Sequence, residues 1–114
     1  MQYHGSCHCG KVKFSFAGEF GAALSCNCSI CSRKGSLLWF TPRENLQLTG
    51  ENELATYTFN KHVIKHRFCK TCGVQPLGEA VDPKGVPTAA INIRCLEDFD
   101  LSKVPLQPWD GRSR

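Results

Sequence analysis

The sequence predicts an all-β domain whose strands are mostly antiparallel. Residues 11–16 alternate between polar and apolar side chains, with Val12, Phe14 and Phe16 on one face, and this two-residue period is that of a half-buried strand. Short segments of similar length recur along the chain between turns rich in glycine, proline and aspartate. Residues 29–34 form the one segment that looks helical, and they amount to a single turn.

Five further strands are expected after the first. They are predicted at residues 36–41, 46–49, 54–59, 63–68 and 89–94, and the breaks fall at Pro42, Gly50-Glu51-Asn52, Gly73, residues 82–85 and Pro87. Within the first of these strands Trp39 and Phe40 should face opposite sides, one toward the core and the other toward a pocket or the surface. The proline-rich end, residues 104–114, is expected to cross the surface as an extended tail.

Length and composition favour one domain, residues 1–114. A chain of 114 residues with 41% hydrophobic residues can form one core of modest size, and no repeat or linker divides it. A domain this small gains from a metal staple, because structural zinc contributes about 10–16 kcal/mol, as much as the whole stability of many domains. We therefore expect the protein to unfold when its zinc is removed.

Charge and hydropathy limit the partners. The net charge is +4, but the 14 Lys and Arg are scattered among 10 Asp and Glu, and no run of Lys and Arg exceeds two residues. This pattern suits small anionic substrates and makes nucleic acid an unlikely partner. The start has no apolar run of signal-peptide length, and no segment approaches the roughly 20 apolar residues that cross a bilayer. We expect a cytoplasmic protein without a membrane partner, whose reduced thiols favour metal ligation over disulfides.

Three clusters hold seven of the eight cysteines. Two of them are short pairs, each followed directly by a glycine, and together they supply the four thiolates that a tetrahedral structural zinc requires. Closing the intervening chain costs entropy that grows only logarithmically with its length. The alternative is a set of buried, unpaired cysteines. We assign one structural zinc to Cys7, Cys9, Cys69 and Cys72.

The remaining cluster, Cys26-Asn27-Cys28-Ser29-Ile30-Cys31, supplies three thiolates within six residues. A second zinc bound here has one further coordination position, and its ligand decides the role of the site. Water or a substrate thiol would make the site catalytic. A side chain would close it and make it structural, and the candidates are His62, His66 and Cys95.

Other candidate residues adjoin this cluster. Arg33 and Lys34 follow it directly and either hold the carboxylates of an anionic ligand or are solvated surface charges. In the strand at 63–68, His62, Ile64, His66 and Phe68 are expected to share one face, so that His66 either carries protons near the zinc or is simply packed and hydrogen-bonded. Cys95 stands alone and is interpreted as a small buried hydrophobe.

These motifs together resemble the family of glutathione-dependent formaldehyde-activating enzymes, which includes the vertebrate centromere protein V. The order C-x-C, C-x-C-x-x-C, C-x-x-C is specific, and the resemblance spans nearly the whole chain without a departure at any metal position. It rests on Gly5-Ser6-Cys7-His8-Cys9-Gly10, Cys26-Asn27-Cys28-Ser29-Ile30-Cys31, His66-Arg67-Phe68-Cys69-Lys70-Thr71-Cys72-Gly73, Asn92-Ile93-Arg94-Cys95-Leu96 and Asp110-Gly111-Arg112.

The resemblance implies a fold and a reaction. The fold would consist of several curled antiparallel β-sheets pinned by zinc, similar to that of a mammalian guanine-nucleotide exchange factor suppressor. The four paired cysteines would hold a structural zinc, and Cys26, Cys28 and Cys31 a catalytic one. The family reaction joins glutathione and formaldehyde as S-hydroxymethylglutathione and is classed in reverse as a carbon–sulfur lyase. The implied partners are a small thiol and a small aldehyde.

Two interpretations outside enzymology remain. The centromere relative points to a module that binds nucleic acid, although the basic extensions expected for that role are absent from this sequence. The exchange-factor suppressor points to a zinc-stabilised domain that holds a partner protein on its sheet surface. A closed and inert second metal site would favour these alternatives.

Overall fold

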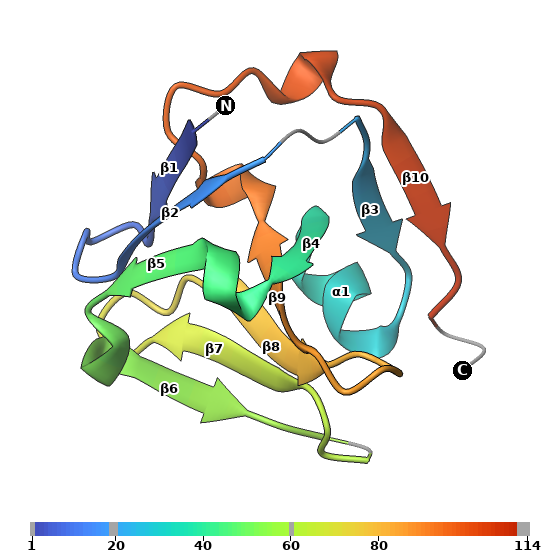
Figure 1. Cartoon of the computed structure of the whole chain (residues 1–114), viewed down its shortest axis with the longest axis horizontal. Coiled ribbons are helices and arrows are strands. Elements are labelled where there is room, and N and C mark those ends of the chain that lie inside the picture. Colours follow the sequence, from blue (N-terminus) through green and yellow to red (C-terminus); the bar gives the residue numbers. More distant parts are fainter. Residues whose placement is uncertain (1, 19–20, 60, 112–114) are drawn as a thin grey trace.

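Ten strands in two sheets form the framework of the computed structural model, which describes residues 2–18, 21–59 and 61–111 (Figure 1). The smaller sheet is antiparallel and has the order β1-β2-β5. Its strands are β1 (Gln2–Ser6), β2 (Lys13–Ala17) and β5 (Leu46–Thr49). The mostly β, single-domain architecture that the sequence predicts is confirmed.

The larger sheet has seven strands in the order β10-β3-β4-β9-β8-β7-β6. They are β3 (Ala23–Cys26), β4 (Leu38–Pro42), β6 (Leu54–Tyr57), β7 (Lys65–Cys69), β8 (Leu77–Val81), β9 (Pro87–Asn92) and β10 (Leu106–Trp109). The one α-helix of the described residues, α1 (Ser29–Lys34), joins β3 to β4, and the 3-10 turns are η1 (Arg43–Asn45), η2 (Glu51–Glu53), η3 (Ile93–Cys95) and η4 (Leu101–Lys103). No helix within the described ranges is both long and apolar enough to cross a membrane.

Aromatic side chains join the two sheets in the core. Phe14 and Phe16 on β2 are buried, as the alternating pattern predicts. The ring of Phe16 stacks on Tyr3 of β1 and on Trp39 of β4, with both centroid distances at 5.3 Å. Phe40 lies on the other side of β4 and is 50% exposed. The prediction that Trp39 and Phe40 face opposite sides is therefore confirmed.

Several element boundaries differ from the sequence-based expectation. The expected strand at 63–68 begins only at Lys65, because His62 has a left-handed φ of 56° that interrupts an extended backbone. His62 therefore does not share the strand face of His66. The expected strand at 89–94 lies at Pro87–Asn92 instead, and the Asn92 side chain accepts the N–H of Arg94 and so starts η3.

The carboxyl end of the described chain is a strand rather than a loose tail. Leu106–Trp109 pairs in parallel with Ala23–Cys26, and Figure 1 shows β10 beside β3 at the edge of the larger sheet. This segment is extended and exposed, as expected, but it is part of the sheet, and its parallel pairing is compatible with the expectation of mostly antiparallel strands. Strands β1, β3 and β8 were also not expected; each is short, and the pairing of neighbouring strands rather than a local pattern defines them.

Two glycine substitutions separate backbone strain from steric exclusion. Gly50 and Gly85 both have left-handed φ values, 81° and 87°, but a Cβ on Gly50 would lie 2.0 Å from the carbonyl oxygen of Lys11, whereas one on Gly85 meets nothing within 4 Å. We expect Gly85→Ala to cost about 1–2 kcal/mol of unfolding free energy and Gly50→Ala about 3 kcal/mol or more. Urea unfolding of both zinc-loaded variants measures the difference; equal losses would contradict the steric argument.

Candidate metal centres

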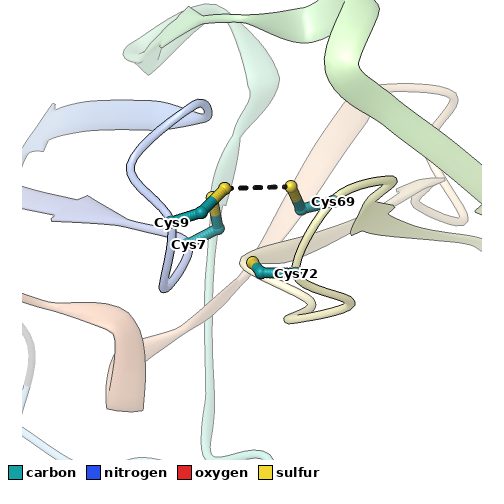
Figure 2. Close-up of side chains that lie close together, drawn as sticks. All are labelled: Cys7, Cys9, Cys69 and Cys72. Atoms are coloured by element: carbon teal, nitrogen blue, oxygen red, sulfur yellow. Dashed lines mark hydrogen bonds between the residues drawn. The ribbon is translucent and has the colours of Figure 1, made fainter.

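Four cysteines from two distant segments meet at one point (Figure 2). Cys7 and Cys9 lie in the loop between β1 and β2, Cys69 is the last residue of β7, and Cys72 lies in the turn that follows. The sulfur of Cys9 lies 3.6 Å from the sulfur of Cys7 and 3.6 Å from that of Cys69, which is 60 residues away in sequence. All four sulfur atoms lie within 4.8 Å of one another.

Backbone N–H groups donate to sulfur atoms of this group. The N–H of Val12 donates to Cys7 Sγ and the N–H of Thr71 donates to Cys69 Sγ, each at 3.4 Å. The N–H of Val74, followed by that of Cys9, lowers the pKa of Cys72 to about 6. Such N–H groups lower the pKa because they donate to the charged sulfur and not to a neutral thiol.

The four sulfur atoms fit a tetrahedral metal ion. Zinc–sulfur bonds of about 2.3 Å place the sulfur atoms of a tetrahedron about 3.8 Å apart, close to the observed separations. Without a cation, four adjacent thiolates repel one another. The N–H of Lys11 lowers the pKa of Cys9, but desolvation and the sulfur atoms of Cys69 and Cys7 raise it to about 11 overall. This group could hold a metal ion, and its all-thiolate composition is consistent with zinc.

A second group of three cysteines is built around the start of α1. Cys26 ends β3, Cys28 is the N-cap of α1 and Cys31 lies in its first turn. The N–H of Cys28 donates to Cys26 Sγ at 3.4 Å, and all three sulfur atoms lie within 4.8 Å of one another. Each of the three residues is partly exposed. This group could also hold a metal ion.

The close approach of the thiols shifts the pKa values of Cys28 and Cys31 in opposite directions. Burial, then the hydrogen bond and negative charge of Cys28, raise the pKa of Cys31 to about 12. Burial also raises the pKa of Cys28, but the backbone N–H groups of Cys31 and Ile30 and the neighbouring thiols lower it below its ordinary value overall. A positive ion bound between the sulfur atoms would offset the negative charge that raises the pKa of Cys31, and this is the chemistry expected of a metal site.

Two of the three side-chain candidates for a fourth ligand, His62 and Cys95, lie elsewhere. Within the described residues, no further His, Cys, Asp or Glu ligand atom joins the three sulfur atoms. His62 is exposed, and its Nδ1 is hydrogen-bonded to Thr58 Oγ1 at 2.8 Å. The thiol of Cys95 is half-buried and donates to the carbonyl of Gln75 at 3.9 Å, and burial followed by the charges of Cys7 and Cys72 raises its pKa to about 11. Cys95 thus adjoins the four-cysteine group.

The three-cysteine group opens onto a cleft of about 510 Å³. His66 and Lys34 also line this cleft. The imidazole of His66 is 8% exposed and stacks on Phe59 with a centroid distance of 5.3 Å. Its Nε2 is buried and has no hydrogen-bond partner among the described residues. Burial, then the positive charge of Lys34, lower the pKa of His66, so its ring is neutral at pH 7.

The structure separates Arg33 from Lys34. Lys34 lines the cleft, its Nζ donates to Gln75 Oε1, and the same nitrogen lies 6.0 Å from the centre of the Phe68 ring. Arg33 is exposed, and its guanidinium donates to the backbone carbonyl of Ser29 at 2.7 Å. Of the two residues predicted to hold the carboxylates of a ligand, Lys34 therefore lines the cleft and Arg33 does not.

Gly111 is a site residue whose role the sequence reasoning missed. A Cβ on Gly111 would lie 2.7 Å from Cys26 Sγ and 2.9 Å from Cys28 Cβ, so only glycine lets the chain pass over the three cysteines. The pairing of Trp109 with Cys26 in β10 and β3 brings this segment there. The motif Asp110-Gly111-Arg112 was the available signal; Arg112 lies outside the described residues.

Comparison with known proteins now identifies the family. The family model for glutathione-dependent formaldehyde-activating enzyme matches residues 2–109. The chain belongs to this family. A crystal structure of a Rhodobacter sphaeroides protein has a similar fold, with a TM-score of 0.76 and 28% sequence identity over 91% of this chain and 99% of that one. The resemblance stated from the motifs is confirmed, and family membership together with the two cysteine groups fits a zinc-binding protein of this type.

The contact at Gly111 predicts a selective loss of metal. In Gly111→Ala the new methyl group must displace Cys26 or Cys28, so we expect the three-cysteine group to lose about 10–100-fold in zinc affinity while the fold persists. Elemental analysis after gel filtration should give one zinc per chain instead of two. Gly21→Ala is the matched control, because a Cβ there meets nothing within 4 Å. Full zinc content in both variants would contradict the prediction.

The electrostatic link between Lys34 and His66 is also measurable. Removing the positive charge in Lys34→Gln should raise the pKa of His66, because one of the two causes that lower it is gone while burial persists. Arg33→Gln, an equal change of charge on the same helix but away from the cleft, should leave that pKa nearly unchanged. NMR titration of the imidazole in the zinc-loaded proteins reports both values. Equal effects of the two variants would show a general surface-charge effect instead.

Proposed function

We propose that this protein is a carbon–sulfur lyase that forms and cleaves the adduct of a small thiol and a small aldehyde, such as S-hydroxymethylglutathione. One observation carries the proposal. Three cysteine sulfur atoms, without a fourth side-chain ligand among the described residues, open onto a cleft that is also lined by His66, whose buried Nε2 has no hydrogen-bond partner there. An open coordination position beside a proton acceptor suits catalysis rather than structural support.

The two metal groups take different roles in this proposal. The four-cysteine group would hold a structural zinc that ties the loop after β1 to the end of β7. Cys26, Cys28 and Cys31 hold the catalytic zinc, to which a thiol gains access through the cleft. When bound there, zinc acts as a Lewis acid that favours the thiolate form of a substrate sulfur at neutral pH.

His66 is the proposed proton carrier. In the cleavage direction its neutral ring accepts the hydroxyl proton of the adduct, the carbon–oxygen double bond forms, and the carbon–sulfur bond breaks with its electron pair passing to sulfur. The proton then returns from His66 to the sulfur as the thiol leaves, so the step is balanced. Because the pKa of His66 lies below its ordinary value, this acceptor stays available at neutral pH and is lost only as the pH falls through the lowered pKa.

Lys34 is the proposed anchor for a substrate carboxylate. Its ammonium group reaches the same cleft as the cysteine sulfur atoms, where one carboxylate of a thiol such as glutathione would replace or join the contact to Gln75. Arg33 is not assigned this role, because its guanidinium is held by the carbonyl of Ser29. The competing interpretation, a zinc-stabilised binding module, calls for a closed second centre, and the open cluster is the observation that disfavours it.

The division of roles predicts opposite behaviour for two serine variants. Cys28→Ser should abolish acceleration above the uncatalysed reaction while the protein keeps its fold and one zinc. Cys69→Ser, in the four-cysteine group, should unfold the protein because it removes a buried ligand from that centre, and a strong chelator should unfold the wild type for the same reason. NMR exchange between free and hydroxymethylated thiol gives the rate, and circular dichroism gives the fold. Normal turnover in folded Cys28→Ser would refute the assignment.

A further inference from the structure

The walls of the cleft are mainly apolar. Side chains from β3, β4, the segment between β6 and β7, and β10 line it next to the three cysteines: Leu24, Leu38, Phe40, Phe59, Ile64 and Trp109. Phe40 is 50% exposed and Ile64 is 48% exposed. A ligand that covers exposed apolar surface binds more favourably, because that surface is removed from water. Aromatic groups provide the largest such area.

The charged groups of the cleft offer little to a zwitterionic ligand. Glu79 also lines it, but its Oε1 accepts from Arg43 Nε at 2.9 Å and its Oε2 accepts from Arg67 Nη1 at 3.0 Å. Its charge is therefore neutralised inside the protein, and a substrate ammonium finds no unpaired carboxylate there. Within the described part of the chain, Lys34 is the one Lys or Arg that lines the cleft.

Glutathione fits these walls poorly. It carries two carboxylates and an ammonium group, and each charged group that enters the cleft without a partner loses its hydration, whereas its peptide units can pair with polar lining side chains such as Ser36 and Thr88. Lys34 can pair with one carboxylate only. A thiol with one carboxylate and an aromatic body would pair with Lys34 and cover the exposed faces of Phe40 and Ile64 at the same time.

We propose that this cleft selects thiol adducts that have an aromatic or branched apolar body and a single carboxylate, in preference to the glutathione adduct. This inference rests on the proposed function, since it names the substrate class of the same site. Phe40 and Ile64 act as specificity-determining residues through contact with the body of the thiol. Lys34 sets the preference for one negative charge.

A panel of four thiols tests the proposal on the zinc-loaded full chain. The probes are 4-(mercaptomethyl)benzoate, the corresponding neutral benzamide, mercaptoacetate and glutathione. Isothermal titration calorimetry measures binding of each thiol, and NMR exchange with formaldehyde measures turnover of each adduct. We expect the aromatic carboxylate to bind at least about tenfold more tightly than glutathione and mercaptoacetate, with the benzamide in between. Equal or tighter binding of glutathione would overturn the inference.

Matched variants locate the preference on the cleft wall. Phe40→Ser should remove most of the advantage of the aromatic thiol and leave glutathione binding nearly unchanged, whereas Leu106→Ser should change neither. Leu106 is a fair control because it is 53% exposed and does not line the cleft. Ile64→Ser repeats the test should Phe40→Ser fail to fold. A preference that survives both cleft variants would refute the role of this wall.

The two readouts keep the proposals separate. Tight aromatic binding without acceleration of any adduct would refute the lyase function and support the ligand class of the cleft. Acceleration with glutathione as the preferred thiol would support the lyase function and refute the ligand class. Acceleration with the aromatic adduct preferred supports both.

Discussion

The four-cysteine centre is the constraint on which the rest of the structure depends. It joins the loop after β1, in the smaller sheet, to the end of β7, in the larger one, across 60 residues of sequence. Strands of four to six residues and a core of modest size leave such a small domain with little stability to spare. A zinc ion held by four thiolates would contribute about 10–16 kcal/mol, which exceeds the logarithmic cost of closing that loop.

The three-cysteine group depends on that framework, but it does not join distant segments of the chain as the four-cysteine centre does. Its residues lie on one continuous stretch, the end of β3 and the start of α1, so they need no distant partner to meet. The segments that surround these three cysteines, in contrast, are brought there only by the folded sheet. The parallel pairing of β10 with β3 brings Trp109 beside Cys26 and Gly111 close to the Cys26 sulfur, and β7 brings His66 to the same cleft. The local motif provides the ligands, and the tertiary structure provides their environment.

The cysteine motifs and the main strand pattern could be predicted because they are local. The spacing within each cysteine cluster and the alternation around Phe14 can both be recognised within a few consecutive residues. The role of Arg33 could not be judged from adjacency, because a helix separates neighbours in sequence. Cys28 at the N-cap of α1 and Cys31 and Lys34 within it are spaced three residues apart and share one face. The guanidinium of Arg33 instead donates to the backbone carbonyl of Ser29. Strand β10 and the position of Gly111 depend on non-local pairing, which no local pattern records.

The charge distribution of the site follows from this one short helix. Burial lowers the pKa of Lys34, whereas the negative charge of Cys31, one turn earlier, raises it. Lys34 in turn lowers the pKa of His66 and so adds to the effect of burial. The same ammonium group can thus balance thiolate charge, attract a carboxylate and keep the imidazole neutral. Because neutralised Glu79 adds no competing charge, the cleft combines a single cation with apolar walls, and this combination favours a ligand with one negative charge and an apolar body.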